Sequence, residues 1–330
     1  MTADYVFLDA EVITVNPRDE VAQAVAVKGN QVCAVGTNEE IRRFAGSETQ
    51  IIDLRGNSLL PGFIDSHLHM LLYGTNYLGV DCKNGVGSIE DIKERLAERT
   101  RNTPAEEWIR GWGYNDTRLA EERHPTRWDL DEVSEKHPII AIRTCGHISA
   151  VNSKALELLG IGRGTPDPEG GTIGRDENGE PTGVLKETAH MLAFEASRYS
   201  ASEMVEALSI ADRDFVRLGI TTIHEAGGYG PDQMRIMYQA VAEGRVKVRI
   251  YAMVCSLNRS EEFVAKMVDS GIITGVGDER FRIGPAKIFT DGSSSGPTCA
   301  TREPYTSDPD DSGILYYSQE EIDNILGAAH

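Results

Sequence analysis

Residues 59–70 read LLPGFIDSHLHM, and this stretch decides the fold class. Its apolar run predicts a buried strand that ends at His67 and His69. Residues two apart on a strand project from the same face, so the two imidazoles are expected to point the same way. In barrels of parallel strands, the carboxyl ends of the strands carry the chemistry. The stretch therefore predicts a strand with a functional pair of histidines at its carboxyl end, as the strands of such a barrel have.

The histidine pair predicts a metal site. Neutral imidazoles are common ligands of Zn²⁺ and similar divalent ions. Asp65 lies on the same face one step deeper, where it can orient a ligand. A pair of histidines with one residue between them also arises by chance on protein surfaces, but the apolar run before this pair disfavours that alternative. His67 and His69 are therefore the first candidate metal ligands.

The chain before this strand has the pattern of a small β module. Strand-like runs at 5–15, 21–36 and 49–60 are separated by Gly, Asn and Pro turns, and a short helix is expected at 39–44. No long amphipathic helix interrupts them. We expect residues 1–58 to form an N-terminal β-sandwich.

The later chain has the pattern of repeated strand and helix units. Strand-like segments at 219–227, 246–254 and 281–292 alternate with helical stretches, as in a parallel sheet. Helix boundaries are signalled by a capping box, by Pro at helix starts and by Gly at helix ends, at Ser200 with Glu203, Gly219, Pro231, Gly244, Ser260 and Gly271. We expect residues 59–330 to form part of a barrel, with an inserted region at about 71–200 that covers the mouth of the site.

Composition excludes several classes of protein. The 330 residues carry a formal net charge of −19, which argues against binding to nucleic acid, because that needs clustered Lys and Arg. No apolar run approaches the roughly 20 residues of a membrane span, and the first residues lack a secretory signal. The five cysteines lack metal-site spacing. We expect a cytoplasmic protein with a small-molecule substrate and no membrane partner.

Three longer stretches carry a family resemblance: residues 111–161 (GWGYNDTRLAEERHPTRWDLDEVSEKHPIIAIRTCGHISAVNSKALELLGI), 221–228 (TTIHEAGG) and 282–305 (RIGPAKIFTDGSSSGPTCATREPY). Together with PGFIDSHLH, they resemble the amidohydrolase superfamily and, within it, the YtcJ-like branch. The resemblance implies an α/β fold with a small β-sandwich and a distorted TIM-type (β/α)8 barrel. It also implies one or two divalent metal ions, Zn²⁺ or another.

The resemblance assigns Lys287 to the end of the fourth barrel strand, where many relatives hold a carboxylated lysine as a metal ligand. Carboxylation converts a cation into an anionic oxygen ligand, which suits a site with divalent ions. The alternative is an unmodified lysine in a salt bridge, with Asp291 as the partner. Both alternatives stay open from the sequence.

His147 and His224 are the candidate catalytic residues. His147 follows an apolar run and precedes a helix expected near Asn152, so it either contacts substrate and stabilises an oxyanion or fixes the turn as a buried residue. His224 ends the second barrel strand, where it either faces substrate or lies in the core. Glu187 is expected to be a polar wall residue or a helix-start acid.

The remaining polar and aromatic candidates carry weaker signals. A cluster of aromatic residues lines a substrate pocket or belongs to the core of the inserted region: Trp108, Trp112 and Tyr114, near Asp116. Three other histidines are expected at the surface or at turns: His124, His137 and His190. No base is paired in the sequence with the serines at 293–295, which disfavours a serine nucleophile.

The resemblance implies hydrolysis of a C–N amide-type bond by metal-activated water. Relatives complete the site with histidines after the fifth and sixth strands and an aspartate after the eighth, and none of these occurs before His330. Only about four of the eight strands are encoded, with a final helix expected from Ser318, so the sequence indicates a truncated gene or a fragment. The 330-residue chain by itself is then expected to lack hydrolase activity. The alternative is a non-catalytic module with weak metal binding that persists by self-association as a homo-oligomer. The sequence does not predict the substrate, because the pocket loops select it and the fold does not.

Overall fold

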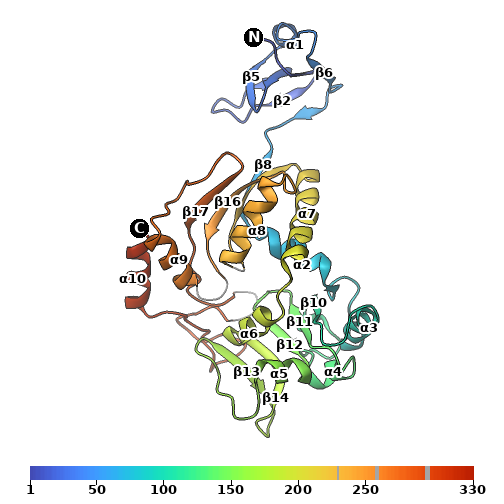
Figure 1. Cartoon of the computed structure of the whole chain (residues 1–330), viewed down its shortest axis with the longest axis vertical. Helices are drawn as coiled ribbons and strands as arrows, with labels where there is room; N and C mark the ends of the chain where they lie inside the picture. The colour runs from blue at the N-terminus through green and yellow to red at the C-terminus, as the bar shows by residue number, and fades with distance from the viewer. Residues whose placement is uncertain (229, 257–259, 294–297) are drawn as a thin grey trace. The chain divides into compact units, whose positions relative to one another are not determined.

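The computed structural model describes residues 1–228, 230–256, 260–293 and 298–330 (Figure 1). The chain divides into two compact units, Met1–Phe63 and Ile64–His330. The change in sequence pattern predicts a boundary at residue 58, and the first unit extends to Phe63. None of the helices in the described ranges is both long and apolar enough to cross a bilayer.

The first unit contains two small sheets. One has the strand order β5 (Gln31–Gly36), β4 (Ala24–Lys28), β1 (Tyr5–Leu8), β6 (Gln50–Asp53), and the other has the order β3 (Val21–Ala22), β2 (Glu11–Ile13), β7 (Ser58–Leu59). Helix α1 (Asn38–Arg42) begins after a capping box of Thr37 and Glu40, close to where the sequence predicts it. Val12 and Val25, one from each sheet, share an apolar cluster. A sandwich of these two sheets stays a prediction.

The second unit contains an open sheet in which chain order and spatial order agree: β8 (Phe63–Leu68), β15 (Ile220–Glu225), β16 (Arg249–Val254), β17 (Phe281–Ala286). The pairs β15–β16 and β16–β17 are parallel. Helix α2 (Met70–Leu78) follows β8, and three helices alternate with the later strands: α7 (Ala201–Arg217), α8 (Pro231–Ala242) and α9 (Ser260–Asp269). This is the predicted succession of strands and helices. Closure into a barrel stays a prediction, because the described strands form an open sheet.

The helix boundaries follow the local signals in the sequence. At the start of α7 the Ser200 side chain accepts a hydrogen bond from the Glu203 backbone N–H. The Glu203 carboxylate accepts one from the Ser200 backbone N–H, as the capping box predicts. Ser318 and Glu321 form the same box before α10 (Gln319–Ala329). Gly219 lies just after α7 with φ of 79°, a conformation that glycine adopts readily.

The inserted region forms a sheet of its own, drawn below the parallel sheet in Figure 1. Its strand order is β13 (Gly171–Arg175), β14 (Pro181–Glu187), β12 (Ile148–Val151), β11 (Ile139–Arg143), β10 (Ile109–Tyr114), β9 (Val80–Asp81). The helices of this region are α3 (Ile89–Thr100), α4 (Arg127–Asp131), α5 (Ser153–Leu159) and α6 (Thr188–Ala196), with a 3-10 turn at Asp116–Arg118. Ile140 and Leu185 of this sheet share one buried core with Ile223 and Ile250 of the parallel sheet. The two sheets are thus packed into a single unit.

Helices α2 and α7 pack closely because α2 carries a glycine at the contact. A Cβ atom added to Gly74 would lie 2.1 Å from the carbonyl oxygen of Ala207 in α7, which is far inside van der Waals contact. A Cβ atom added to Gly327 in α10 would meet no other atom within 4 Å. Close packing therefore requires a glycine at position 74, whereas position 327 has room for a larger residue.

We predict that Gly74→Ala lowers the free energy of unfolding by about 1–3 kcal/mol, because the helices must separate to admit the methyl group. The matched control is Gly327→Ala, which should raise helix stability by up to about 1 kcal/mol. Urea denaturation followed by circular dichroism measures both. Equal effects of the two substitutions would contradict the close packing of α2 on α7.

Candidate active site

The two predicted metal ligands lie at the end of β8. His67 is in the strand, and His69 is the residue before the first turn of α2. Their ring centroids are 5.5 Å apart and the rings meet edge to face. Asp65 accepts a hydrogen bond from the His67 backbone N–H (3.1 Å), so its carboxylate holds the main chain of the ligand segment.

Lys287 reaches the same place from β17, the far edge of the sheet. Its Nζ lies 3.3 Å from His67 Nε2, although the two residues are 220 positions apart. The Lys287 backbone donates to the Val254 carbonyl (3.0 Å) and accepts from Ser260 Oγ (2.8 Å). These bonds fix the segment from which the side chain extends toward His67.

The alternative role of Lys287, a salt bridge with Asp291, has no support in the geometry. No ion pair joins these residues in the described part of the chain, and Asp291 Oδ2 accepts a hydrogen bond from the Ala300 backbone (3.1 Å). The Lys287 amine instead lies 4.5 Å from the centre of the Phe289 ring. Carboxylation of the lysine stays a prediction.

His69 is held in one tautomer by a partner that the sequence did not indicate. Its Nδ1 lies 2.7 Å from the Gly227 carbonyl oxygen, which can only accept, so Nδ1 carries the hydrogen and Nε2 of the neutral ring keeps its lone pair. Buried Glu225 supports this arrangement, because its carboxylate accepts from the backbone N–H of Met70 (2.7 Å) and of Gly227 (3.1 Å). His69 Nε2 is thus prepared to act as a ligand.

Electrostatics favours neutral forms at this site. The positive charge of Lys287, then burial, lowers the pKa of His67. Burial also lowers the pKa of Lys287. Neutral imidazole is the form that binds a metal, and neutral amine is the form that can be carboxylated. No three His, Cys, Asp or Glu side chains converge on one point within the described ranges, so Lys287 is the third ligand candidate.

His147 belongs to a second cluster, built around the buried carboxylate of Glu187. His147 precedes β12, and its Nδ1 lies 2.9 Å from Glu187 Oε2. The hydroxyl groups of Thr298 and Tyr316 donate to the same carboxylate. Burial raises the pKa of Glu187, but the hydrogen bonds from His147, Thr298 and Tyr316 outweigh it and lower the pKa overall. Glu187 does directly precede helix α6, but its side chain bonds to His147 instead of capping the helix.

His224 lies on β15 as predicted, but the structure does not bring its ring against the other candidates. The ring packs edge-on against Tyr251 of β16, with centroids 5.0 Å apart. Thr222, Arg249 and Arg282 line the same hollow in the sheet face. A role for His224 in substrate contact stays a prediction.

His137 lies in a bend before β11, as expected, whereas His190 lies within helix α6, so the expectation of a position at the surface or at a turn was wrong for His190. Both are buried, with 7% and 1% of their surface exposed. His190 Nδ1 bonds to Ser149 Oγ (3.0 Å), and His137 bonds to Ser134 Oγ (2.9 Å). Ser149 comes from β12, and His137 also bonds to the distant Thr103 carbonyl (3.1 Å), so the sequence around each histidine does not reveal its burial.

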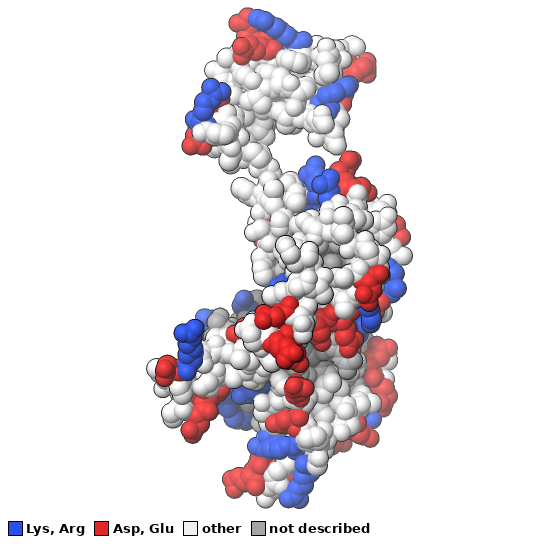
Figure 2. Space-filling model, turned by 90° about the vertical axis from the view of Figure 1, so that its left-hand side faces the viewer, with Lys and Arg blue, Asp and Glu red and all other residues white. Residues whose placement is uncertain are grey.

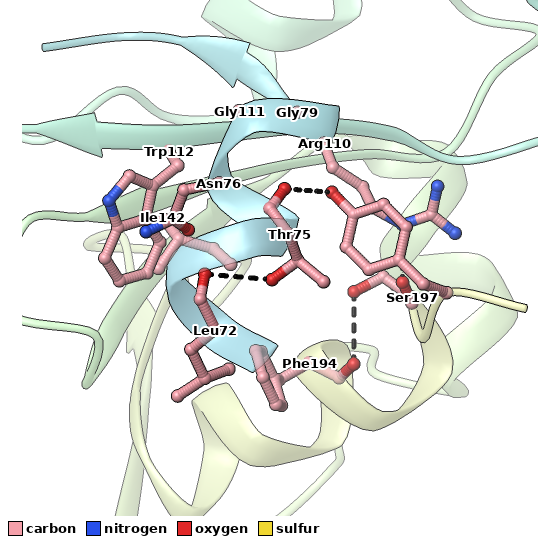
Figure 3. Close-up of a pocket in the computed structure, with 11 residues that line it drawn as sticks. Leu72, Thr75, Asn76, Gly79, Arg110, Gly111, Trp112, Ile142, Phe194 and Ser197 are labelled. Atoms are coloured by element: carbon pink, nitrogen blue, oxygen red, sulfur yellow. Dashed lines mark hydrogen bonds between the residues drawn. The ribbon is translucent and has the colours of Figure 1, made fainter. Parts of the chain in front are cut away.

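The aromatic cluster is mostly core. Trp108 and Trp112 pack against the main apolar cluster, and Tyr114 is fully buried with its hydroxyl 3.1 Å from His124 Nδ1. Trp112 also lines the small cavity of Figure 3, in which Tyr199 donates a hydrogen bond to the carbonyl of Thr75. A cavity of about 30 Å³ holds a water-sized molecule and is too small for a substrate. Ser294 and Ser295 lie outside the described residues.

Acidic side chains outnumber basic ones over the middle of the face drawn in Figure 2, in keeping with the net charge of −19. The basic candidate at the site is Lys287, a half-buried residue whose amine lies beside Phe289 and His67. The contacts of the Lys287 amine are thus with the histidine and the aromatic ring beside it.

Comparison with known proteins identifies the family. The model of the amidohydrolase family matches residues 50–330. The amidohydrolase YtcJ of Bacillus subtilis is 34% identical over 93% of this chain and 58% of its own length. The N-substituted formamide deformylase of Arthrobacter pascens is 36% identical over 68% of this chain and 42% of its own length. The chain thus spans about half the length of these relatives.

Solved structures show the same fold. A metal-dependent hydrolase of Pyrococcus horikoshii superposes with a TM-score of 0.75 at 26% identity, over 98% of this chain and 62% of that one. A metal-dependent hydrolase of Pyrococcus furiosus superposes with a TM-score of 0.73, also at 26% identity, over 98% of this chain and 64% of that one. The match covers both compact units of the chain.

The burial of His190 predicts a pH-dependent stability. Burial, with the charge of His147, lowers its pKa from 6.5 to about 4. Its contribution is fully present above pH 6.5 and is lost as the pH falls toward 4, because the unfolded chain takes up the proton first. The loss should reach about 3 kcal/mol. Urea unfolding at several pH values should show a weaker pH dependence for His190→Gln than for the wild type. An unchanged pH dependence in His190→Gln, or an equal change in the control His330→Gln, would contradict this.

Proposed function

Because this chain belongs to the amidohydrolase family, we propose that it hydrolyses a C–N amide-type bond of a small molecule, using a divalent metal held by His67, His69 and Lys287. One observation carries the proposal. Two imidazoles and a lysine amine converge from the ends of β8 and β17, with 3.3 Å between Lys287 Nζ and His67 Nε2. The deformylase and the metal-dependent hydrolases among its relatives support the reaction class.

The residues present fit a metal ion. His69 offers Nε2 because its Nδ1–H is committed to the Gly227 carbonyl, and His67 offers Nε2 at the point that Lys287 approaches. Zn²⁺ is the ion that suits a site with two imidazoles best, and one or two ions are compatible with a third, bridging ligand. When bound, the ion supplies a polarised carbonyl and a water of lowered pKa.

Lys287 completes the site if its amine is carboxylated. The neutral amine attacks carbon dioxide, a C–N bond forms, and one proton leaves to solvent, which gives an anionic carbamate. The partly buried position beside His67 favours the neutral amine that this reaction needs. The carbamate oxygens would then face the same point as the two imidazoles.

The substrate class is proposed from the relatives. The Arthrobacter pascens relative is named for its action on N-substituted formamides, which carry a C–N amide bond in a small molecule. Hydrolysis of such a compound releases formate and an amine. N-substituted formamides are therefore the first substrates to test on this chain.

We predict that His67→Ala and His69→Ala each lower zinc affinity by tenfold or more, because each removes an imidazole ligand. The control is His330→Ala, at the exposed end of α10. Elemental analysis after chelation and equilibration with buffered zinc measures the bound metal. Unchanged zinc binding in both ligand variants would remove the basis of the proposed metal site.

We predict that zinc-loaded protein kept in bicarbonate carries one additional carboxyl group on Lys287. Native mass spectrometry should detect the added mass and lose it after acidification, and Lys287→Arg should lack it from the start. Full zinc occupancy with an unmodified Lys287 would show that the amine itself lies beside the metal and that the carbamate is not formed.

A further inference from the structure

We propose that Glu187 is a positioning residue that orients His147 toward the substrate and balances the charge of its ring; this rests on the proposed hydrolytic function. A carboxylate at this point can only accept, so the 2.9 Å contact places the hydrogen of His147 on Nδ1. Nε2 then faces away from Glu187, and within the described ranges it bonds to no other residue. About 29% of the His147 side chain is exposed, so the ring is not sealed in the core.

A turn needs no buried carboxylate, yet the Glu187 carboxylate is buried and has three side-chain hydrogen-bond donors. The carboxylate is almost fully withdrawn from solvent, and a buried charge is costly unless hydrogen bonds compensate it. Three side-chain donors do so, from His147, Thr298 and Tyr316. A neutral glutamine could accept the bond from His147 without that cost. The retention of an ion therefore favours a role for its charge.

The backbone of Glu187 is held in an unfavourable conformation. Its φ of 52° and ψ of −121° lie outside the regions that residues with a Cβ ordinarily occupy. Such conformations cost roughly 1–3 kcal/mol and persist where the surrounding structure enforces them. Here the Glu187 backbone N–H donates to the His147 carbonyl (2.9 Å), so main chain and side chain both bind the same histidine. The strained backbone conformation of Glu187 thus accompanies two hydrogen bonds that fix its position relative to His147.

The segment that follows Lys287 delivers two of the donors. Thr298 and Tyr316 lie on the chain between β17 and α10, and the Tyr316 backbone donates to the Thr290 carbonyl (3.0 Å). Tyr317 anchors the end of this segment through a hydrogen bond to Glu261 of α9 (2.6 Å). The chain therefore leaves the proposed metal site at Lys287 and returns to the Glu187 carboxylate. Assembly of the His147–Glu187 pair depends on the seating of this segment.

The proposal gives each of these residues a role in the reaction. His147 presents Nε2 to the substrate, where a protonated ring donates a hydrogen bond to the carbonyl oxygen as negative charge develops on it. Glu187 lies behind the ring, holds its orientation and stabilises the imidazolium. The hydroxyls of Thr298 and Tyr316 keep the carboxylate ionised.

The test compares Glu187→Gln with Glu195→Gln. Glu195 lies in α6, the helix that follows Glu187, and its carboxylate pairs with Arg198 and not with a histidine. Two readouts are measured on the full chain loaded with zinc. The first is the rate at which diethyl pyrocarbonate modifies His147 at about pH 8, mapped by mass spectrometry. The second is the hydrolysis of N-substituted formamides. Circular dichroism and urea unfolding establish that each variant is folded.

Glu187→Gln should slow modification of His147 severalfold and lower kcat by about 10–100-fold at an unchanged KM, while Glu195→Gln matches the wild type. Wild-type values of both quantities in folded Glu187→Gln would overturn the inference. If Glu187→Gln does not fold, Tyr316→Phe, which keeps the carboxylate but removes a donor, should show smaller decreases in both quantities, and no decrease would overturn it. If the wild type hydrolyses no formamide, the proposed substrate class fails, and the modification rate of His147 alone decides whether Glu187 activates the ring.

Discussion

Lateral pairing of β8, β15, β16 and β17 is the constraint on which the candidate site depends. Because β8 and β17 are the two outer strands, the 3.3 Å between His67 Nε2 and Lys287 Nζ, across 220 positions of sequence, also requires the strand ends to curve toward one another. The carboxyl ends of the strands lie at the same end of the sheet. The helices pack their apolar residues around Ile223 and Ile250 of the sheet. Helices α8 and α9 join β15, β16 and β17, whereas the inserted region with β9 to β14 separates β8 from β15 in the chain. The polar groups at the strand ends nevertheless meet at the same end of the sheet.

Two buried carboxylates organise the histidines of the molecule in related ways. Glu225 accepts two backbone N–H bonds and fixes the loop whose Gly227 carbonyl selects the tautomer of His69. Glu187 accepts from two hydroxyls and binds His147 directly. Burial alone would raise the pKa of Glu187, and the hydrogen bonds from His147, Thr298 and Tyr316 lower it and stabilise the ion. The hydrogen bonds around each buried carboxylate thus also help to orient an imidazole.

Much of the local structure could be predicted from the residues themselves. Ser200 with Glu203 and Ser318 with Glu321 predict helix starts, and the structure has helices beginning directly after both serines. His67 and His69 were recognisable from their spacing at the end of an apolar run, and Lys287 from its resemblance to a family motif. The buried positions of His137 and His190 were not, because their burial depends on elements that pack over them from elsewhere in the chain.

The sequence by itself determined the succession of strands and helices, the family, and the residue types able to bind a metal. These follow from periodicity, capping and motif, which are encoded within a few neighbouring residues. Only the tertiary structure decided that Lys287 meets His67, that Gly227 and Glu225 fix His69, and that Glu187 with Thr298 and Tyr316 holds His147. The physical reason is that each of these contacts joins residues far apart in the chain, and their geometry is set by strand register and side-chain packing, which no local pattern specifies.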